Sequence, residues 1–130
     1  MNIAIKTSGA SHVALRTTDL ARARRFYVDT LGFPVIAETP ELFLVQAGAV
    51  AIGLRAPTAE TAPGDTFNDS RVGLDHMALA CDTDAELTRV ADALSAEGIP
   101  NTGIKTDEVL GKQYVSFHDP DGIIWELYRT

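Results

Sequence analysis

Two histidines and one glutamate are the residues of this sequence best suited to chemistry. His12 and His76 each precede a short apolar stretch, and Glu126 stands inside the apolar run 123–128. Side chains alternate along a strand, so each of the three is expected to point to the sheet face opposite its apolar neighbours. A carboxylate inside an apolar strand is costly to bury unless it is paired or bound to a metal. Two imidazoles and one carboxylate on one concave sheet face therefore predict a site for a divalent first-row metal with open coordination positions.

The two histidines occupy equivalent positions of an internal repeat. Ser11–Leu15 resembles Asp75–Leu79, and after a helical stretch Leu31–Pro34 resembles Glu97–Pro100. The offset between the copies is 64 residues at the histidines and 66 at the glycines that follow. Self-similarity of this kind indicates a duplicated structural unit. A lone histidine on a strand is most often a structural residue, so the equivalence of the pair is what favours a functional site.

Each copy is predicted to contain a strand, a helix and three further strands. The strands are expected near 10–16, 33–38, 42–46 and 50–55 in the first copy, and near 74–81, 101–106, 113–118 and 122–129 in the second. Thr18 or Asp19 can cap the first helix, Asp82 or Thr83 can cap the second, and Gly98 ends the second. The predicted fold class is α+β, with two tandem βαβββ repeats that form a cupped mixed sheet and carry their helices on its outer face.

The length of 130 residues suits a single domain over 1–130. Repeat one is expected at about 8–56 and repeat two at about 74–130, with a connector at about 57–73 that is rich in proline, glycine and aspartate. A loop of this length is uncommon in a compact domain. The connector could be either a lid over the site or a passive tether between the repeats.

Composition excludes several classes of partner. The net charge of −7 disfavours binding to nucleic acid and to anionic membranes. No apolar segment approaches the length of a membrane helix, and the N-terminus lacks the features of a signal peptide, so we expect a cytoplasmic protein. The single cysteine, Cys81, lies in an apolar stretch and is expected to be a buried structural thiol.

Four motifs resemble the vicinal-oxygen-chelate superfamily, which includes glyoxalases, extradiol dioxygenases, and fosfomycin- and bleomycin-resistance proteins. They are His12-x-x-Leu15, Phe26-Tyr27, Leu31-Gly32-Phe33 and the closing Asp119-Pro-Asp-Gly-Ile-Ile-Trp-Glu-Leu127, which is the most specific. The resemblance covers nearly the whole chain. It implies a divalent metal ion (Fe, Mn, Zn or Ni) held by ligands from the first and last strands of each repeat. Those positions are His12, the residue near Gly53, His76 and Glu126.

The sequence departs from the family pattern at Gly53. Alignment of the two repeats puts Gly53 opposite Glu126, where members similar to glyoxalase I or methylmalonyl-CoA epimerase carry a Glu or His. The remaining set of two histidines and one glutamate is that of the extradiol dioxygenases and the fosfomycin-modifying transferases. The acidic and apolar stretch 106–110 stands where those transferases carry a basic phosphonate-binding segment, and it disfavours them.

Further candidate site residues come from the same resemblance and from the expected strand faces. Extradiol dioxygenases carry a tyrosine ten residues before the glutamate, and here Ser116 has that spacing, with Tyr114 and His118 on the same strand face. These three are the candidate catalytic residues.

The candidates for substrate binding are Arg16, Arg55, Phe43 and Tyr128. An arginine there could hold an anionic group or could be a rim residue, and the aromatic rings could stack on a ligand.

Three functions remain open at this point. We expect a metal-dependent enzyme that acts on a small oxygenated molecule through a site of two histidines and one glutamate. The alternative is a metal-independent protein that sequesters a drug or natural product, as bleomycin-resistance proteins do. A third reading is a purely structural member in which an arginine pairs with Glu126. The resemblance also implies a homodimer, and the groove could form within one chain or across two.

Overall fold

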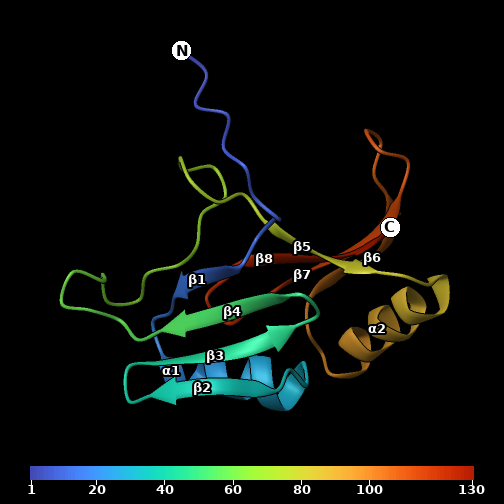
Figure 1. The fold of residues 1–130 in the computed structure, drawn as a ribbon. Helices are drawn as coiled ribbons and strands as arrows, with labels where there is room; N and C mark the ends of the chain where they lie inside the picture. The colour runs from blue at the N-terminus through green and yellow to red at the C-terminus, as the bar shows by residue number, and fades with distance from the viewer. The chain divides into compact units, whose positions relative to one another are not determined.

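The computed structural model describes all 130 residues, which divide into two compact units, Met1–Thr61 and Ala62–Thr130. The first unit contains β1 (His12–Arg16), α1 (Leu20–Arg24), a π-helical turn η1 (Arg25–Thr30), β2 (Val35–Thr39), β3 (Leu42–Ala47) and β4 (Val50–Arg55). The second contains β5 (Met77–Cys81), α2 (Asp84–Ala96), β6 (Asn101–Thr106), β7 (Gln113–His118) and β8 (Ile124–Arg129). The predicted α+β class with tandem βαβββ repeats is therefore confirmed (Figure 1).

Each unit builds one four-stranded mixed sheet, in the order β1-β4-β3-β2 in the first unit and β5-β8-β7-β6 in the second. The first strand of each unit pairs in parallel with the last, and the other neighbours are antiparallel. Ala14 pairs with Gly53, and Ala78 pairs with Glu126. Each alanine stands two residues after its histidine, so the structure places Gly53 and Glu126 at the same position of the two sheets, as the sequence alignment predicts.

The first helix begins as expected but changes its form. The Asp19 side chain accepts a hydrogen bond from the Arg22 backbone N–H at 3.0 Å, which caps α1. After one turn the helix widens, and the Leu31 N–H donates to the Phe26 carbonyl, five residues back. The turn brings the rings of Phe26 and Tyr27 together edge to face, with 5.1 Å between centroids. Tyr27 is fully buried there.

The second helix follows the sequence prediction at both ends. The Thr83 hydroxyl accepts from the Glu86 N–H at 3.1 Å, and Leu87, Ala91 and Leu94 form the buried stripe. Beyond the helix Gly98 takes a φ of +70°, which lets the Ile99 N–H donate to the Leu94 carbonyl at 2.9 Å. Figure 1 shows α2 along one face of the second sheet. Neither helix has the length and apolar content that crossing a membrane would require.

The helix-facing side of each sheet forms the core of its unit. The largest buried side chains of the strands are Phe43, Val45, Ile52 and Leu54 in the first unit, and Val115 and Trp125 in the second. Cys81 is buried and free, as predicted. Because strand side chains alternate, the other face of each sheet carries the residues that stand between these core positions. His12 and Ala14 are exposed on that face in the first unit, and His76 and Ala78 in the second.

The connector contains no helix or strand, and part of it is fixed to the second unit. The Phe67 N–H donates to the Asp121 carbonyl at 2.9 Å, in the turn between β7 and β8. That turn is itself rigid, because Asp119 Oδ1 accepts from the N–H groups of Asp121 and Ile123. The segment around Phe67 is thus anchored beside the closing motif.

Candidate functional site

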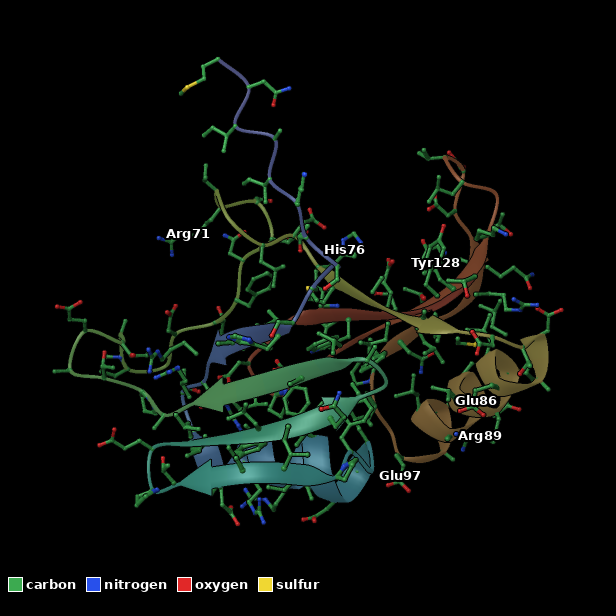
Figure 2. The ribbon with its side chains drawn as sticks, viewed as in Figure 1. Arg71, His76, Glu86, Arg89, Glu97 and Tyr128 are labelled. Carbon is green, nitrogen blue, oxygen red and sulfur yellow. The ribbon has the colours of Figure 1, made fainter.

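The second unit brings together two of the three predicted metal ligands. His76 stands directly before β5, and Glu126 lies on β8, the strand that pairs with β5. His76 Nε2 is 3.4 Å from Glu126 Oε1, and the Glu126 side chain is only 15 % exposed. Figure 2 shows His76 on the side of this sheet away from α2, the helix that carries Glu86 and Arg89. The imidazole and the carboxylate therefore share the open face.

A third residue sets the orientation of this imidazole. His76 Nδ1–H donates to Asp75 Oδ1 at 2.6 Å, so the other ring nitrogen is the one that faces Glu126. The hydrogen bond to Asp75 raises the pKa of His76 above its usual value, partial burial opposes it, and the charge of Glu126 adds to the rise. The raised pKa favours the protonated imidazole, the state in which His76 and Glu126 form a charge-assisted pair.

These residues fit a divalent metal. A carboxylate that accepts a hydrogen bond from one ring nitrogen of a histidine leaves the other nitrogen to bind a metal. This arrangement orients metal-binding imidazoles and makes them better ligands. Glu126 is a mostly buried carboxylate whose partner is a histidine and not an arginine. Neither unit by itself gathers three or more His, Cys, Asp or Glu side chains at a spacing that holds a metal. His76 and Glu126 are thus the two candidate ligands of the second unit.

The third predicted ligand, His12, belongs to the first unit. It opens β1, its side chain is exposed, and its Nδ1 lies 3.1 Å from Ser11 Oγ. Its position in the first sheet corresponds to that of His76 in the second, because Ala14 and Ala78 occupy matching places in the parallel strand pairs.

A pair of tyrosines forms an aromatic wall beside Glu126. Tyr114 and Tyr128 are directly paired across β7 and β8, and their rings stack with 6.1 Å between centroids and 12° between planes. The Tyr128 hydroxyl donates to Asp107 Oδ2 at 2.8 Å, which fixes the ring. Lost hydration and the Asp107 carboxylate raise the pKa of Tyr128 to about 12. Tyr128 is therefore a neutral wall at physiological pH and not a base.

The other two candidate catalytic residues lie away from this wall. Ser116 pairs directly with Glu126 across β7 and β8, and His118 pairs with Ile124. Both line a pocket of about 260 Å³ whose other residues are Pro100, Asn101 and Thr102. Those three were not among the predicted site residues, and they meet Ser116 because β6 bulges between Asn101 and Ile104. Gly103 inside the expected strand was the available signal, since an isolated glycine in a strand often marks a bulge.

The remaining predicted binding residues have different surroundings. Arg16 and Arg55 are both exposed and neighbour each other in the β1–β4 pair, and Arg16 Nη1 donates to the Ala56 carbonyl at 2.7 Å. Phe43 is a correction. It is 2 % exposed in the core of the first unit, with the Arg24 guanidinium 5.9 Å from its ring centre. Phe43 packs under the helix and is removed from the candidate ligand-binding residues.

Comparisons with known proteins agree with the fold and the repeat. The sequence model of the Glyoxalase/Bleomycin resistance protein/Dioxygenase superfamily matches residues 9–127. The uncharacterized protein YwkD of Bacillus subtilis is 33% identical, over 91% of this chain and 94% of its own length. A crystal structure described as lactoylglutathione lyase from Agrobacterium tumefaciens is 26% identical, with a TM-score of 0.75 over 95% of this chain and 94% of that one. A glyoxalase family protein from Enterococcus faecalis is 25% identical, with a TM-score of 0.75 over 93% of this chain and 97% of that one.

Proposed function

Because the chain belongs to the glyoxalase/bleomycin resistance protein/dioxygenase superfamily, we propose that it is a metal-dependent enzyme acting on a small oxygenated molecule, with His12, His76 and Glu126 as ligands. The observation that carries the proposal is the pair of His76 and Glu126 on the open face of the second sheet, with Asp75 behind the imidazole. A bound divalent ion (Fe, Mn, Zn or Ni) would supply a Lewis acid for two neighbouring oxygens of the substrate.

The side chains of the second unit have distinct tasks in this proposal. Asp75 accepts the Nδ1 proton of His76 and so keeps the Nε2 lone pair available on the side of Glu126. Tyr128, held neutral by Asp107, acts as a fixed wall. Ala78 is small and exposed next to Glu126, so it leaves room above the sheet for a substrate.

Two features of the site bear on the other functions. A structural member was expected to pair Glu126 with an arginine, and Glu126 pairs with His76 instead. A metal-independent binding protein remains the second candidate, because the stacked rings of Tyr114 and Tyr128 offer an aromatic surface next to the exposed Ala80. The likeness to a protein described as a lyase supports the enzyme over the passive binder.

Metal binding by tag-free protein tests the proposal. Protein purified without chelators should contain a divalent metal, and after metal removal it should bind Mn²⁺, Zn²⁺, Fe²⁺ or Ni²⁺ at one site per chain in calorimetry. His12→Ala, His76→Ala and Glu126→Gln should each weaken that binding by at least about tenfold, since loss even of a residue that only supports a ligand costs about that much. Glu86→Gln is the matched control, because Glu86 is an exposed carboxylate on α2 that pairs with Arg89.

Two results would contradict the metal reading. One is the absence of bound metal together with no binding of any of the four ions. The other is unchanged metal affinity in both Glu126→Gln and His76→Ala. Retention of ligand binding by the double variant His12→Ala/Glu126→Ala would favour the sequestering protein.

We also propose a homodimer, as the family resemblance implies. Light scattering of the tag-free protein should give twice the mass of one 13.9 kDa chain. A monomer at all concentrations would contradict it.

A further inference from the structure

The pocket next to Glu126 is built into the second sheet. It measures about 260 Å³ and is lined by Pro100, Asn101, Thr102, Ser116 and His118. Ser116 faces Glu126 directly across the strand pair, and His118 is the diagonal neighbour of that carboxylate. Paired strands lie roughly 5 Å apart, so the pocket begins one strand away from the proposed metal ligand.

Protein contacts occupy most polar groups of the pocket wall. Asn101 Nδ2 donates to Ser95 Oγ and to the Ile99 carbonyl, and its Oδ1 accepts from the Gly103 N–H. Thr102 Oγ1 accepts from the Ser116 N–H at 3.0 Å and donates to the Gly103 carbonyl at 2.8 Å. These bonds hold the bulge of β6 in place and give the pocket a fixed shape.

Two polar side chains of the pocket have no protein partner. The Ser116 hydroxyl makes no hydrogen bond within the chain although the residue is only 9 % exposed, and the His118 ring is likewise unpaired. His118 is exposed, and neither group is a buried polar atom without a partner, so solvent reaches both and a ligand oxygen in the pocket could replace that water. Both groups can donate to an oxygen placed between them.

The first unit provides an internal comparison. The position of Ser116 opposite Glu126 corresponds to that of Leu44 opposite Gly53. Gln46 of the first unit corresponds to His118 of the second. In the bulge of β2, Val35 and Ile36 correspond to Asn101 and Thr102. Three of these four positions are thus apolar in the first unit, where Gln46 is the polar one, and all four are polar in the second. The two donor side chains, Ser116 and His118, therefore belong to the second sequence copy and not to the fold.

We propose that this pocket binds a carboxylate or carbonyl oxygen of a small organic substrate, with Ser116 Oγ–H and a His118 ring N–H as the donors. The proposal rests on the proposed function, because it places that oxygen one strand from the residue that would hold the metal. A volume of about 260 Å³ lies below the roughly 300–1,000 Å³ of sites for drug-sized ligands. The part of the substrate that enters this pocket is therefore small, such as the acid end of a small oxo or hydroxy acid.

Chemical-shift mapping of the full chain in its metal-free form tests this pocket. The probes are acetate (carboxylate only), hydroxyacetone (carbonyl without carboxylate) and pyruvate (both). We expect pyruvate to shift the backbone signals of Thr102 and Ser116 and the ring signals of His118. The acetate and hydroxyacetone arms then show which oxygen the pocket takes. Ser116→Ala and His118→Leu should each weaken pyruvate binding at least about fivefold, in line with the loss of one hydrogen bond.

The controls separate this proposal from the metal site. Gln46→Leu, at the equivalent position of the first unit, should leave pyruvate binding unchanged. Glu126→Gln should lose metal affinity yet still show pyruvate shifts at Ser116. Metal binding by the wild-type chain without any probe shift at Thr102, Ser116 or His118 would overturn the pocket and leave the proposed function standing. Because this mapping uses the unaltered protein, it decides the question even where Ser116→Ala fails to fold.

Discussion

Gly53 and Glu126 occupy the same position of two sheets, each paired with the alanine that stands two residues after a histidine. Gly53 has no steric reason to be a glycine. A Cβ at Gly53 would meet the Ala14 Cβ at 3.7 Å, which is an ordinary contact, and its φ lies outside the left-handed region. The first unit therefore lacks the carboxylate of the second because the side chain differs, while the strand pairing at this position is the same in both units.

We expect Gly53→Ala to be tolerated. The added methyl fits beside Ala14, and the unfolded chain loses conformational freedom, so stability should rise by up to about 1 kcal/mol. Urea unfolding followed through Trp125, which is 1 % exposed, measures the change. A loss of more than about 2 kcal/mol, a cost typical of overpacking, would show that the space is not there. Gly98→Ala is the contrast, because its φ of +70° makes any side chain strained.

Asp75→Asn should lower the pKa of His76. The hydrogen bond from His76 Nδ1 to the Asp75 carboxylate is the largest cause of the raised pKa, and an amide carries no charge to sustain it. NMR titration of the His76 ring signals in metal-free protein measures the effect. The control is Glu86→Gln, which removes a carboxylate on α2 and should leave the pKa of His76 unchanged. An unchanged His76 pKa in Asp75→Asn would mean that Asp75 does not hold the ring.

The same pair affects stability in a defined pH range. Because the pKa of His76 in the folded state lies above the usual 6.5, its contribution is complete below that value. The contribution is lost as the pH rises through the folded pKa. Over that range the wild-type protein should therefore lose a small increment of stability, and Asp75→Asn, which keeps only the charges of Glu126 and Asp107, should lose less. Unfolding midpoints across the range, compared between the two proteins, give the measurement.

Asp107→Asn should bring the pKa of Tyr128 down from about 12, though not fully to its usual 10. Lost hydration is the larger cause of the rise and stays in the variant, whereas the carboxylate that accepts the hydroxyl proton is gone. Tyrosinate absorbance during alkaline titration reports the change, and Tyr128→Phe identifies which transition belongs to this residue. A Tyr128 transition at the same pH in both proteins would contradict the assigned hydrogen bond.

Thr83→Ala should cost about 1 kcal/mol of stability. Its hydroxyl accepts from the Glu86 N–H and caps α2, the helix that covers the core of the second unit. Thr83→Ser keeps the acceptor oxygen and should recover most of the loss. Urea unfolding of the two variants checks both expectations, and equal stabilities would show that the cap contributes nothing.

The strands and caps could be predicted because local signals decide them. Alternating apolar residues and the turn at Asp119–Gly122 bound the last strand, and a single polar hydroxyl or carboxylate marks each helix start. The π-helical turn could not be predicted, since it depends on how Phe26 and Tyr27 pack in the core. The prediction that Phe43 binds a ligand was wrong because both of its neighbours are leucines. In such an apolar stretch the alternation of polar and apolar residues does not show which side chains face the core.

The pocket could not be predicted from the sequence for a different reason. Ser116 and His118 could be placed on one strand face, but the residues that meet them come from another strand at a shifted register. A bulge moves every later residue by one place, and its position is set by pairing across the sheet. Gly103, which takes a φ of +66°, signals a bulge in the sequence, but a glycine alone does not fix which residues then meet Ser116.

Both sheets carry such a bulge in an end strand, β2 in the first unit and β6 in the second. An end strand with evenly spaced N–H and carbonyl groups is a template on which a strand from another molecule can add and start aggregation. The extra residue between Asn101 and Ile104 breaks that even spacing along β6. The irregularity that opens a pocket on one side of the strand therefore also protects its outer edge, so a deletion that straightened β6 would be expected to cost solubility as well as the pocket.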